Sequence, residues 1–191
     1  MGRMWQANLN QLRLTTMQTT PASGDTVEVV TATPAQSVIV ANLFQLYAHD
    51  FSAFHDVEPG EDGRFGCDKL PLYWSDPKRH AFLIRRRGKL AGFVLVKQGS
   101  EITGDNCVWD MAEFFVLRRH RRDGVGTEAA RQIWNRYPGR WEIRVMEANQ
   151  AAHAFWARAI QSVLNQAISP VRVQLADRVW FVFAFDSAQG R

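Results

Sequence analysis

Apolar and polar residues alternate along the chain in a way that predicts strands and helices in turn. Val27 to Val30 is β-branched and predicts a first strand, and Pro34 opens a stretch with helical spacing that runs to about Ala48. The region from Asp50 to Asp76 is aromatic but is interrupted by glycines and prolines, which favours one short helix within a long loop. The folded part of the chain is therefore expected to begin near Thr26.

The later segments continue this alternation. Apolar runs, helical spacing and turn residues predict, in chain order, a hairpin of 81–86 and 90–97, a strand at 107–117, a helix at 124–137, a strand at 140–146, a helix from Asn149, and a hairpin of 171–175 and 179–185. The strand at 107–117 is mostly apolar, so we expect it near the centre of the sheet. Connections through a helix favour parallel neighbours, so the middle of the sheet is expected to contain a parallel pair. With no internal repeat and no linker, we expect one mixed α/β domain at residues 26–188, preceded by a loose arm at residues 1–25.

Composition narrows the class of protein. The 191 residues are 46% hydrophobic and 22% charged, which is typical of a soluble globular domain. No apolar run approaches the roughly 18 residues of a membrane span, and the N-terminus has no continuous apolar segment of the secretory kind. Cys67 and Cys107 lie far apart without metal-ligand spacing, which favours free thiols, a cytoplasmic location and no bound metal.

The charge balance indicates an anionic ligand. The formal net charge is +4, and arginine carries most of the positive charge, because the chain has only four lysines, at positions 69, 78, 89 and 97. Arginine favours forked contacts with phosphate and carboxylate groups. A nucleic acid would suit the same composition, but a modest basic balance alone gives it little support. We therefore expect neither a nucleic-acid partner nor a membrane partner.

The most informative segment runs from Met111 to Trp134. A buried strand leads directly into a short basic turn at residues 118–126, and the turn leads directly into a helix. Backbone N–H groups at a helix N-terminus lack partners within the helix and carry partial positive charge. Gly124 and Gly126 let the main chain approach an anion closely, and four arginines flank them. The turn therefore predicts a pyrophosphate site.

Spacing separates this turn from two common phosphate loops. A P-loop ends in Gly-Lys-Ser or Gly-Lys-Thr, which is absent here. A dinucleotide fingerprint needs three glycines in the first strand-turn-helix unit, whereas four predicted strands precede this turn. What remains is the pattern Arg/Gln-x-x-Gly-x-Gly/Ala, which Arg121, Gly124 and Gly126 satisfy. Taken alone, the same pattern also suits an ordinary capped helix with a solvated basic face.

Two motifs together resemble the GNAT acyltransferase superfamily, which is named for its N-acetyltransferases. Phe114 to Gly126 is similar to the family's strand and phosphate loop, and Asn149-x-x-Ala152-x-x-Phe155-Trp156 is similar to its second motif, Asn-x-x-Ala-x-x-Phe-Tyr. The element order agrees from Thr26 to Asp186, and the motif detail covers Asp110 to Ile160. The resemblance implies a single domain with a mixed, mostly antiparallel sheet, helices on both faces, and two parallel central strands that splay apart.

The resemblance also implies acetyl-CoA as the co-substrate and assigns its contacts. The main chain of Phe114 and Val116 is expected to bind the pantetheine arm. Asn149 matches a position that orients the cofactor, and it suits a helix N-cap equally well. The pyrophosphate is expected to bind the loop and the start of the helix, namely Arg121, Arg122, Asp123, Gly124, Val125, Gly126 and Thr127.

Trp156 departs from the family's pattern. Many members carry a tyrosine at this position, placed to protonate the leaving thiolate, and a tryptophan side chain cannot act as an acid at neutral pH. The Gly-Phe that usually follows this helix is also replaced, by Ile160-Gln161. We keep Trp156 among the expected cofactor contacts, and we expect either a thiolate that leaves unassisted or a different proton donor.

Glu113 and Asp110 are the candidate general bases. Direct transfer to an amine needs a base that removes a proton near pH 7. Glu113 lies in an apolar run, where desolvation is expected to raise its pKa, and its position resembles that of an acidic residue in polyamine-acetylating members. Asp110 corresponds to the glutamate base of other members. Three positions apart on one strand, they are predicted to lie on opposite faces, and either could instead pair with an arginine such as Arg144.

The region from Asp50 to Trp74 matches the family's variable segment, which faces the substrate. Its aromatic side chains suit either the wall of an acceptor cleft or simple core packing, and its acidic residues (Asp56, Glu58, Glu61 and Asp62) suit attraction of a cationic amine. The residues expected to line the acceptor cleft are Tyr47, Asp50, Tyr73 and Trp74.

The predicted function is acetyl-CoA-dependent N-acetylation of a primary amine, in a small molecule or a peptide. A homodimer is compatible with this prediction. The alternative is a non-catalytic acyl-CoA-binding or interaction module, which the tryptophan at position 156 favours and the acidic residue at position 113 disfavours.

Overall fold

The computed structural model describes residues 26–165 and 167–188, so the predicted arm at residues 1–25 lies outside the described residues. Seven strands form one sheet in the order β1-β2-β3-β4-β5-β7-β6. Their bounds are β1 Val27–Thr31, β2 Arg79–Arg86, β3 Lys89–Gln98, β4 Trp109–Val116, β5 Arg140–Met146, β6 Val171–Leu175 and β7 Arg178–Asp186. The helices are η1 Pro34–Gln36, α1 Ser37–Phe51, η2 Leu70–Trp74, η3 Arg118–His120, α2 Val125–Arg136 and α3 Gln150–Leu164.

These elements confirm the predicted order and fold class. Each predicted strand and helix is present within two residues or so of its expected ends, apart from the first helix, which begins as η1 and continues as α1 to Phe51. The short helix expected between 50 and 76 is η2. The one-turn helix η3, which lies inside the arginine-rich turn, was not predicted, because the run of four arginines and one histidine at residues 118–122 has no apolar periodicity to indicate it.

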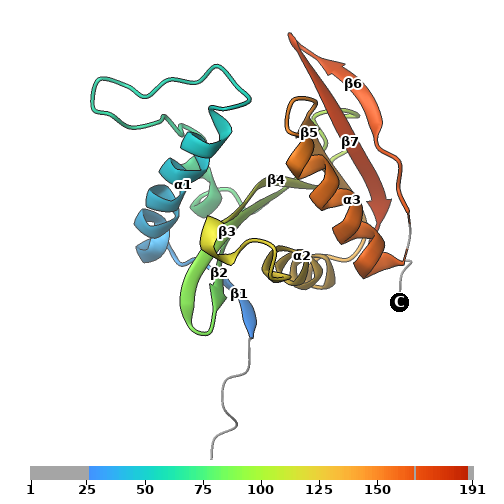
Figure 1. Cartoon of the computed structure of the whole chain (residues 1–191), viewed down its shortest axis with the longest axis horizontal. Coiled ribbons are helices and arrows are strands. Elements are labelled where there is room, and N and C mark those ends of the chain that lie inside the picture. The colour runs from blue at the N-terminus through green and yellow to red at the C-terminus, as the bar shows by residue number, and fades with distance from the viewer. Residues whose placement is uncertain (1–25, 166, 189–191) are drawn as a thin grey trace, which may run out of the picture.

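Helices cover both faces of the sheet (Figure 1). On one face, Val40 and Leu43 of α1 pack against the strand residues Leu83, Phe93 and Phe115. On the other face, α2 and α3 pack against a second apolar cluster, whose strand members are Val29, Phe82, Ile84, Ala91, Val94, Val96, Met111, Val116, Trp141, Ile143, Val145, Phe183 and Phe185. Side chains alternate along each strand, so successive residues serve the two clusters in turn.

The middle of the sheet opens between β4 and β5. These strands are parallel, as predicted, but they pair only at Trp109 with Trp141 and at Asp110 with Glu142. Beyond these pairs, the edge of β4 that faces β5 has no partner strand. Unpaired backbone groups on a strand edge can bind an extended ligand as an added strand would. This opening positions the candidate site.

Candidate functional site

The predicted phosphate loop, residues 118–126, joins the end of β4 to the start of α2. Arg122 and Gly124 both adopt positive φ, at 69° and 76°, and these two residues turn the chain back into the helix. The hydrogen bond from the Glu128 N–H to the Gly124 carbonyl, at 3.0 Å, begins the helical ladder. The amides of Val125, Gly126 and Thr127 therefore precede the ladder and are available to an anion.

Ion pairs hold this loop in place. Arg121 donates from Nε to the Val116 carbonyl at 2.7 Å and from Nη2 to Asp50 at 2.6 Å. Arg118 donates to the other oxygen of Asp50 at 2.5 Å. These contacts keep the pKa of Asp50 below its usual value, although partial burial opposes the shift. Asp50 thus links the end of α1 to the loop and does not line the pocket described below.

A close contact between α2 and α3 sets the position of the loop. A Cβ atom on Gly126 would lie 3.0 Å from the ring of Phe155, so only glycine fits without displacing that ring. Phe155 stacks on Phe114 of β4 at 5.8 Å between ring centroids. Trp156 is 5% exposed and packs edge-on against Phe114 at 4.9 Å. The two predicted motifs are therefore in direct contact across the open end of the sheet.

A pocket of about 510 Å³ lies where β4 and β5 separate. Elements distant in sequence contribute to its wall, among them α1, η2, β4, β5, α3 and the loop that contains Lys69. Six of the predicted site residues line it together: Tyr47, Tyr73, Glu113, Phe114, Asn149 and Trp156. The fold thus joins predicted cofactor contacts, a predicted base and two predicted acceptor contacts in one cavity.

A β-bulge places Glu113 and Asp110 on the same face of β4, which makes the prediction of opposite faces wrong. Leu95 pairs with Glu113 and Lys97 pairs with Asp110, and the register shifts between Leu95 and Val96. Leu95 and Lys97 are two residues apart and point the same way, so their partners do too. The extra residue of β4, Ala112, interrupts the alternation that a regular strand would keep, so residues three apart lie on the same face.

Glu113 has the electrostatic environment of a base that works near neutral pH. Burial raises the pKa of this carboxyl to about 7, while a hydrogen bond with Tyr47 lowers it and the nearby Asp110 raises it. The pKa of Tyr47 lies well above its usual value, first because of burial and then because of Glu113. Tyr47 is therefore a neutral phenol at pH 7, and it can donate to the Glu113 carboxylate.

Asp110 has a different environment. It is 1% exposed, and its Oδ2 atom lies 2.8 Å from Arg144 and 3.5 Å from Lys97. Burial raises its pKa, and the two cations oppose that shift. Both cations also pair with Glu101, so four charged side chains form one cluster beside the pocket. Unlike Glu113, Asp110 does not line the pocket.

We expect the Asp110→Asn protein to be less stable than wild type by about 2 kcal/mol, because it leaves the buried Lys97 and the half-buried Arg144 with only Glu101 as a partner. Urea denaturation at pH 7 would measure the loss. Asp123→Asn, which removes an exposed carboxylate from its pair with Arg86, is the matched control and is expected to change stability by less than about 1 kcal/mol. Equal losses in the two variants would contradict this role for Asp110.

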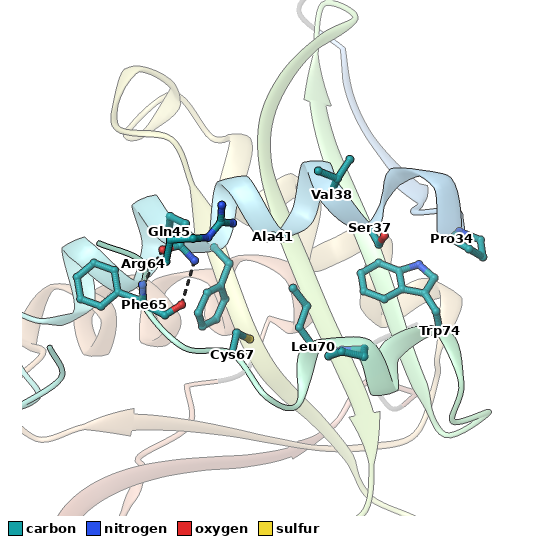
Figure 2. A pocket seen from close by; sticks show the side chains of 12 residues that line it. Pro34, Ser37, Val38, Ala41, Gln45, Arg64, Phe65, Cys67, Leu70 and Trp74 are labelled. Atoms are coloured by element: carbon teal, nitrogen blue, oxygen red, sulfur yellow. Dashed lines mark hydrogen bonds between the residues drawn. The ribbon is translucent and has the colours of Figure 1, made fainter. Parts of the chain in front are cut away.

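Trp74 does not line the pocket that contains Glu113. Its indole N–H donates to the Ala32 carbonyl at 3.0 Å, and the side chain lines a second cavity of about 520 Å³ between α1 and the segment from Arg64 to Trp74 (Figure 2). The Gln45 amide bonds the main chain of Phe65 in both directions, at 2.8 and 3.1 Å, and so fastens this segment to α1. Trp74 therefore belongs to this second cavity and not to the pocket that contains Glu113.

The sequence analysis named Arg144 as an alternative partner of the two carboxylates, and Arg144 does pair with Asp110, but it missed the other basic side chains of the pocket. Lys69, Arg79, Lys97, Arg144 and Arg178 all line it. They come from five separate parts of the chain and share no motif, so no local signal could have brought them together. The acidic residues at positions 56, 58, 61 and 62, which suited attraction of a cationic amine, are exposed and do not line the pocket.

The sequence profile of the acetyltransferase (GNAT) family matches residues 40–160, which is more than half of the chain. The chain belongs to this family. That membership confirms the predicted family and the prediction of an acetyltransferase. No curated protein matches the chain in sequence.

Solved structures of GNAT acetyltransferases share the fold at low sequence identity. An acetyltransferase from Thermus thermophilus is 16% identical, with a TM-score of 0.61 over 84% of this chain and 97% of that one. NAA60 of Arabidopsis thaliana, in complex with a bisubstrate analogue, is 13% identical, with a TM-score of 0.59 over 84% and 98%. An aminoglycoside 6'-N-acetyltransferase complexed with coenzyme A is 12% identical, with a TM-score of 0.53 over 84% and 97%.

The residues of this GNAT protein suit acetyl-CoA. The helix amides from Val125 to Thr127 precede the helical ladder, and the β4 edge opposite β5 is unpaired beyond Asp110. Asn149 caps α3, since its side chain accepts from the Ala152 N–H at 3.0 Å, and it also lines the pocket. Its cap role is therefore shown, and its contact with the cofactor stays a prediction.

Two further features of the described residues concern membranes and metals. None of the described helices is both long and apolar enough to cross a membrane. Within residues 26–165 and 167–188, no group of three His, Cys, Asp or Glu side chains is arranged to hold a metal ion.

Proposed function

We propose that this chain transfers the acetyl group of acetyl-CoA to a primary amine by direct attack, with Glu113 as the general base. The observation that carries the proposal is the position of Glu113. Its carboxyl group lines the pocket at the point where β4 and β5 separate, its pKa is about 7, and it forms a hydrogen bond with Tyr47. A carboxyl group with this pKa is half ionised at neutral pH, which suits removal of a proton from an amine.

The reaction forms one bond and breaks one. The neutral amine nitrogen attacks the acetyl carbonyl carbon and a C–N bond forms. The C–S bond then breaks, and the sulfur leaves with the electron pair as the CoA thiolate. Glu113 accepts the proton that the amine nitrogen loses, either directly or through a water molecule. Trp156 lines the pocket but has no acidic proton, so the thiolate leaves without a proton from this position.

The loop and the open strand edge would hold the co-substrate. We propose that the pyrophosphate binds the amides from Arg122 to Thr127, with charge from Arg121 and Arg122, and that the pantetheine arm binds the free edge of β4 near Phe114. The Val116 carbonyl already accepts from Arg121, so the β4 contact would fall on the residues that precede it. This arrangement directs the acetyl group toward Glu113.

We expect activity to fall at low pH with an apparent pKa near 7. The pKa of Glu113 is raised to about 7, so the carboxyl is protonated and unable to act as a base below that value. kcat/KM for a fixed amine, measured from pH 5.5 to 9 by thiol release, should lose about tenfold per pH unit below 7, beyond the loss expected from protonation of the amine. A profile that follows the amine alone would contradict the role of Glu113.

Thiol release from acetyl-CoA across an amine library tests the function as a whole. Turnover with any primary amine, together with mass-spectrometric detection of the acetylated product, is the expected result. The alternative is a non-catalytic acyl-CoA-binding module, which the tryptophan at position 156 favours. CoA binding by calorimetry without turnover on any amine would support that alternative and contradict the proposal.

A further inference from the structure

The pocket that contains Glu113 is unusually basic for a site that is to receive an amine. Its lining includes five cationic side chains and two acidic ones, Glu101 and Glu113. From outside the lining, the buried Asp110 pairs with Lys97 and Arg144, Asp76 pairs with Arg79, and the exposed Asp177 lies near Arg178. A positively charged pocket repels a simple alkylammonium ion and attracts a molecule that carries negative charge.

One of these cations has no carboxylate partner among the described residues, and a second has only a distant, exposed one. Lys97 and Arg144 share Asp110 and Glu101. Arg79 lies 3.3 Å from Asp76. Lys69, by contrast, has no carboxylate within 4 Å among the described residues, and Arg178 has only the solvent-exposed Asp177 at 3.8 Å.

Lys69 and Arg178 are separate from the phosphate loop. The lining of this pocket contains no residue from 118 to 127, and the loop arginines Arg118 and Arg121 have Asp50 as their partner. The pyrophosphate site therefore does not account for the positive charge around Glu113. Lys69 lies close enough to Glu101 to lower the pKa of that carboxyl together with Lys97 and Arg144, although partial burial opposes the shift.

We propose that the acceptor is a small primary amine that also carries a carboxylate or phosphate group, and that Lys69 and Arg178 bind this anionic group. This inference rests on the proposed function. The amine would lie against Glu113, and the anionic group toward the rim where Lys69 and Arg178 lie. On the neighbouring strand β3, Lys97 lies two residues beyond Leu95, which pairs with Glu113, and two residues span about 7 Å along a strand. The pocket volume of about 510 Å³ suits such a molecule.

Matched pairs of acceptors test the proposal. The carboxylate pair is 5-aminopentanoate and pentylamine, and the phosphate pair is O-phosphoethanolamine and ethanolamine. In wild type, the anionic member of at least one pair is expected to have a kcat/KM about tenfold above its neutral partner. The pair that shows the preference identifies the anionic group. Equal or lower values for both anionic members would overturn the proposal while leaving the acetyltransferase function intact.

Variants show whether the two named cations are responsible. Lys69→Gln with Arg178→Gln is expected to lower kcat/KM for the preferred anionic amine about tenfold and to leave the neutral partner unchanged. Lys89→Gln with Arg158→Gln removes two exposed cations outside the pocket and serves as the control. An equal loss on both members of the pair, or an equal loss in the control, would overturn the assignment. A peptide with an acidic N-terminus that is acetylated faster than all four small amines would overturn the small-molecule assignment.

A binding measurement separates this inference from the proposed function. If CoA binds but no amine turns over, the proposed function has failed, and the acceptor site is then tested by calorimetry on the CoA complex. Tighter binding of N-acetyl-5-aminopentanoate than of N-pentylacetamide, lost in the Lys69→Gln, Arg178→Gln protein, would still support an anion site. Equal binding of the two compounds would overturn it.

Discussion

The Glu113→Gln protein is expected to acetylate its amine with a kcat/KM about 10²–10³-fold below that of wild type. Glutamine has nearly the same shape but cannot accept a proton, so the amine must lose its proton to solvent. Affinity for CoA should change little, because the phosphate loop is separate from Glu113. Thiol-release kinetics and calorimetry with CoA measure the two quantities. A large loss of CoA affinity would show that the substitution disturbs the fold and not only the chemistry.

The same substitution, Glu113→Gln, is expected to lower activity but to raise stability. The folded-state pKa of Glu113, about 7, lies above its usual value of 4.5, so the ionised carboxylate costs the folded state free energy at higher pH. That cost grows as the pH rises from about 4.5 to 7 and is complete above about pH 8, with an upper bound of roughly 3 kcal/mol. Glu113→Gln should therefore be more stable than wild type at pH 8 and nearly equal to it at pH 4. Urea denaturation at both pH values tests this, and a variant less stable at pH 8 would contradict the buried, uncompensated state of Glu113.

The Gly92→Ala protein is expected to be less stable than wild type by about 3 kcal/mol or more. Gly92 of β3 pairs with Val116 of β4, and a Cβ atom there would lie 1.9 Å from the Phe115 carbonyl oxygen. Because the obstructing atom belongs to the backbone, no side-chain rotation can relieve the contact. The two strands would have to separate just where β4 leads into the phosphate loop.

Thermal unfolding measures this effect against a matched control. A loss of about 3 kcal/mol corresponds to a fall in Tm of roughly 6–12 °C for a domain of this size. Gly66→Ala is the control, since a Cβ atom at Gly66 meets nothing within 4 Å and its φ is not in the left-handed region. Similar Tm values for the two variants would contradict the close approach of β3 and β4 at Gly92.

Local patterns predicted the elements and the anion loop because each depends on neighbours in sequence. The alternation of Trp141, Ile143 and Val145 predicted β5 with the bounds that the structure has. The two glycines and the arginines of the loop predicted the start of α2 in the same way. The GNAT motifs then predicted that the loop and the Asn149 helix bind the same cofactor. In the structure, the contact between Phe114, Phe155 and Gly126 packs the loop against this helix.

Register errors show where local reasoning fails. A spacing of three residues puts two side chains on opposite faces of a regular strand. This rule gave the wrong relative faces for Asp110 and Glu113. The bulge at Ala112 depends on how β4 fits the longer strand β3, which is a property of two strands and not of one. Asp50 and Trp74 show the same limit, because the partners of Asp50 are 68 and 71 residues away and the partner of Trp74 is 42 residues away.

Local sequence was enough to establish the α/β class and the order of the elements, and to predict the phosphate loop and the two candidate carboxylates. Hydrophobic period, glycine conformation and motif spacing act over a few residues, so they can be recognised without a structure. The folded arrangement was needed to show which carboxylate lines the pocket, and that the pocket is basic. The burial of Glu113 and the presence of Lys69 and Arg178 in the lining of the same pocket depend on side chains from distant parts of the chain. Both exist only once the chain is folded, since desolvation and charge act through space.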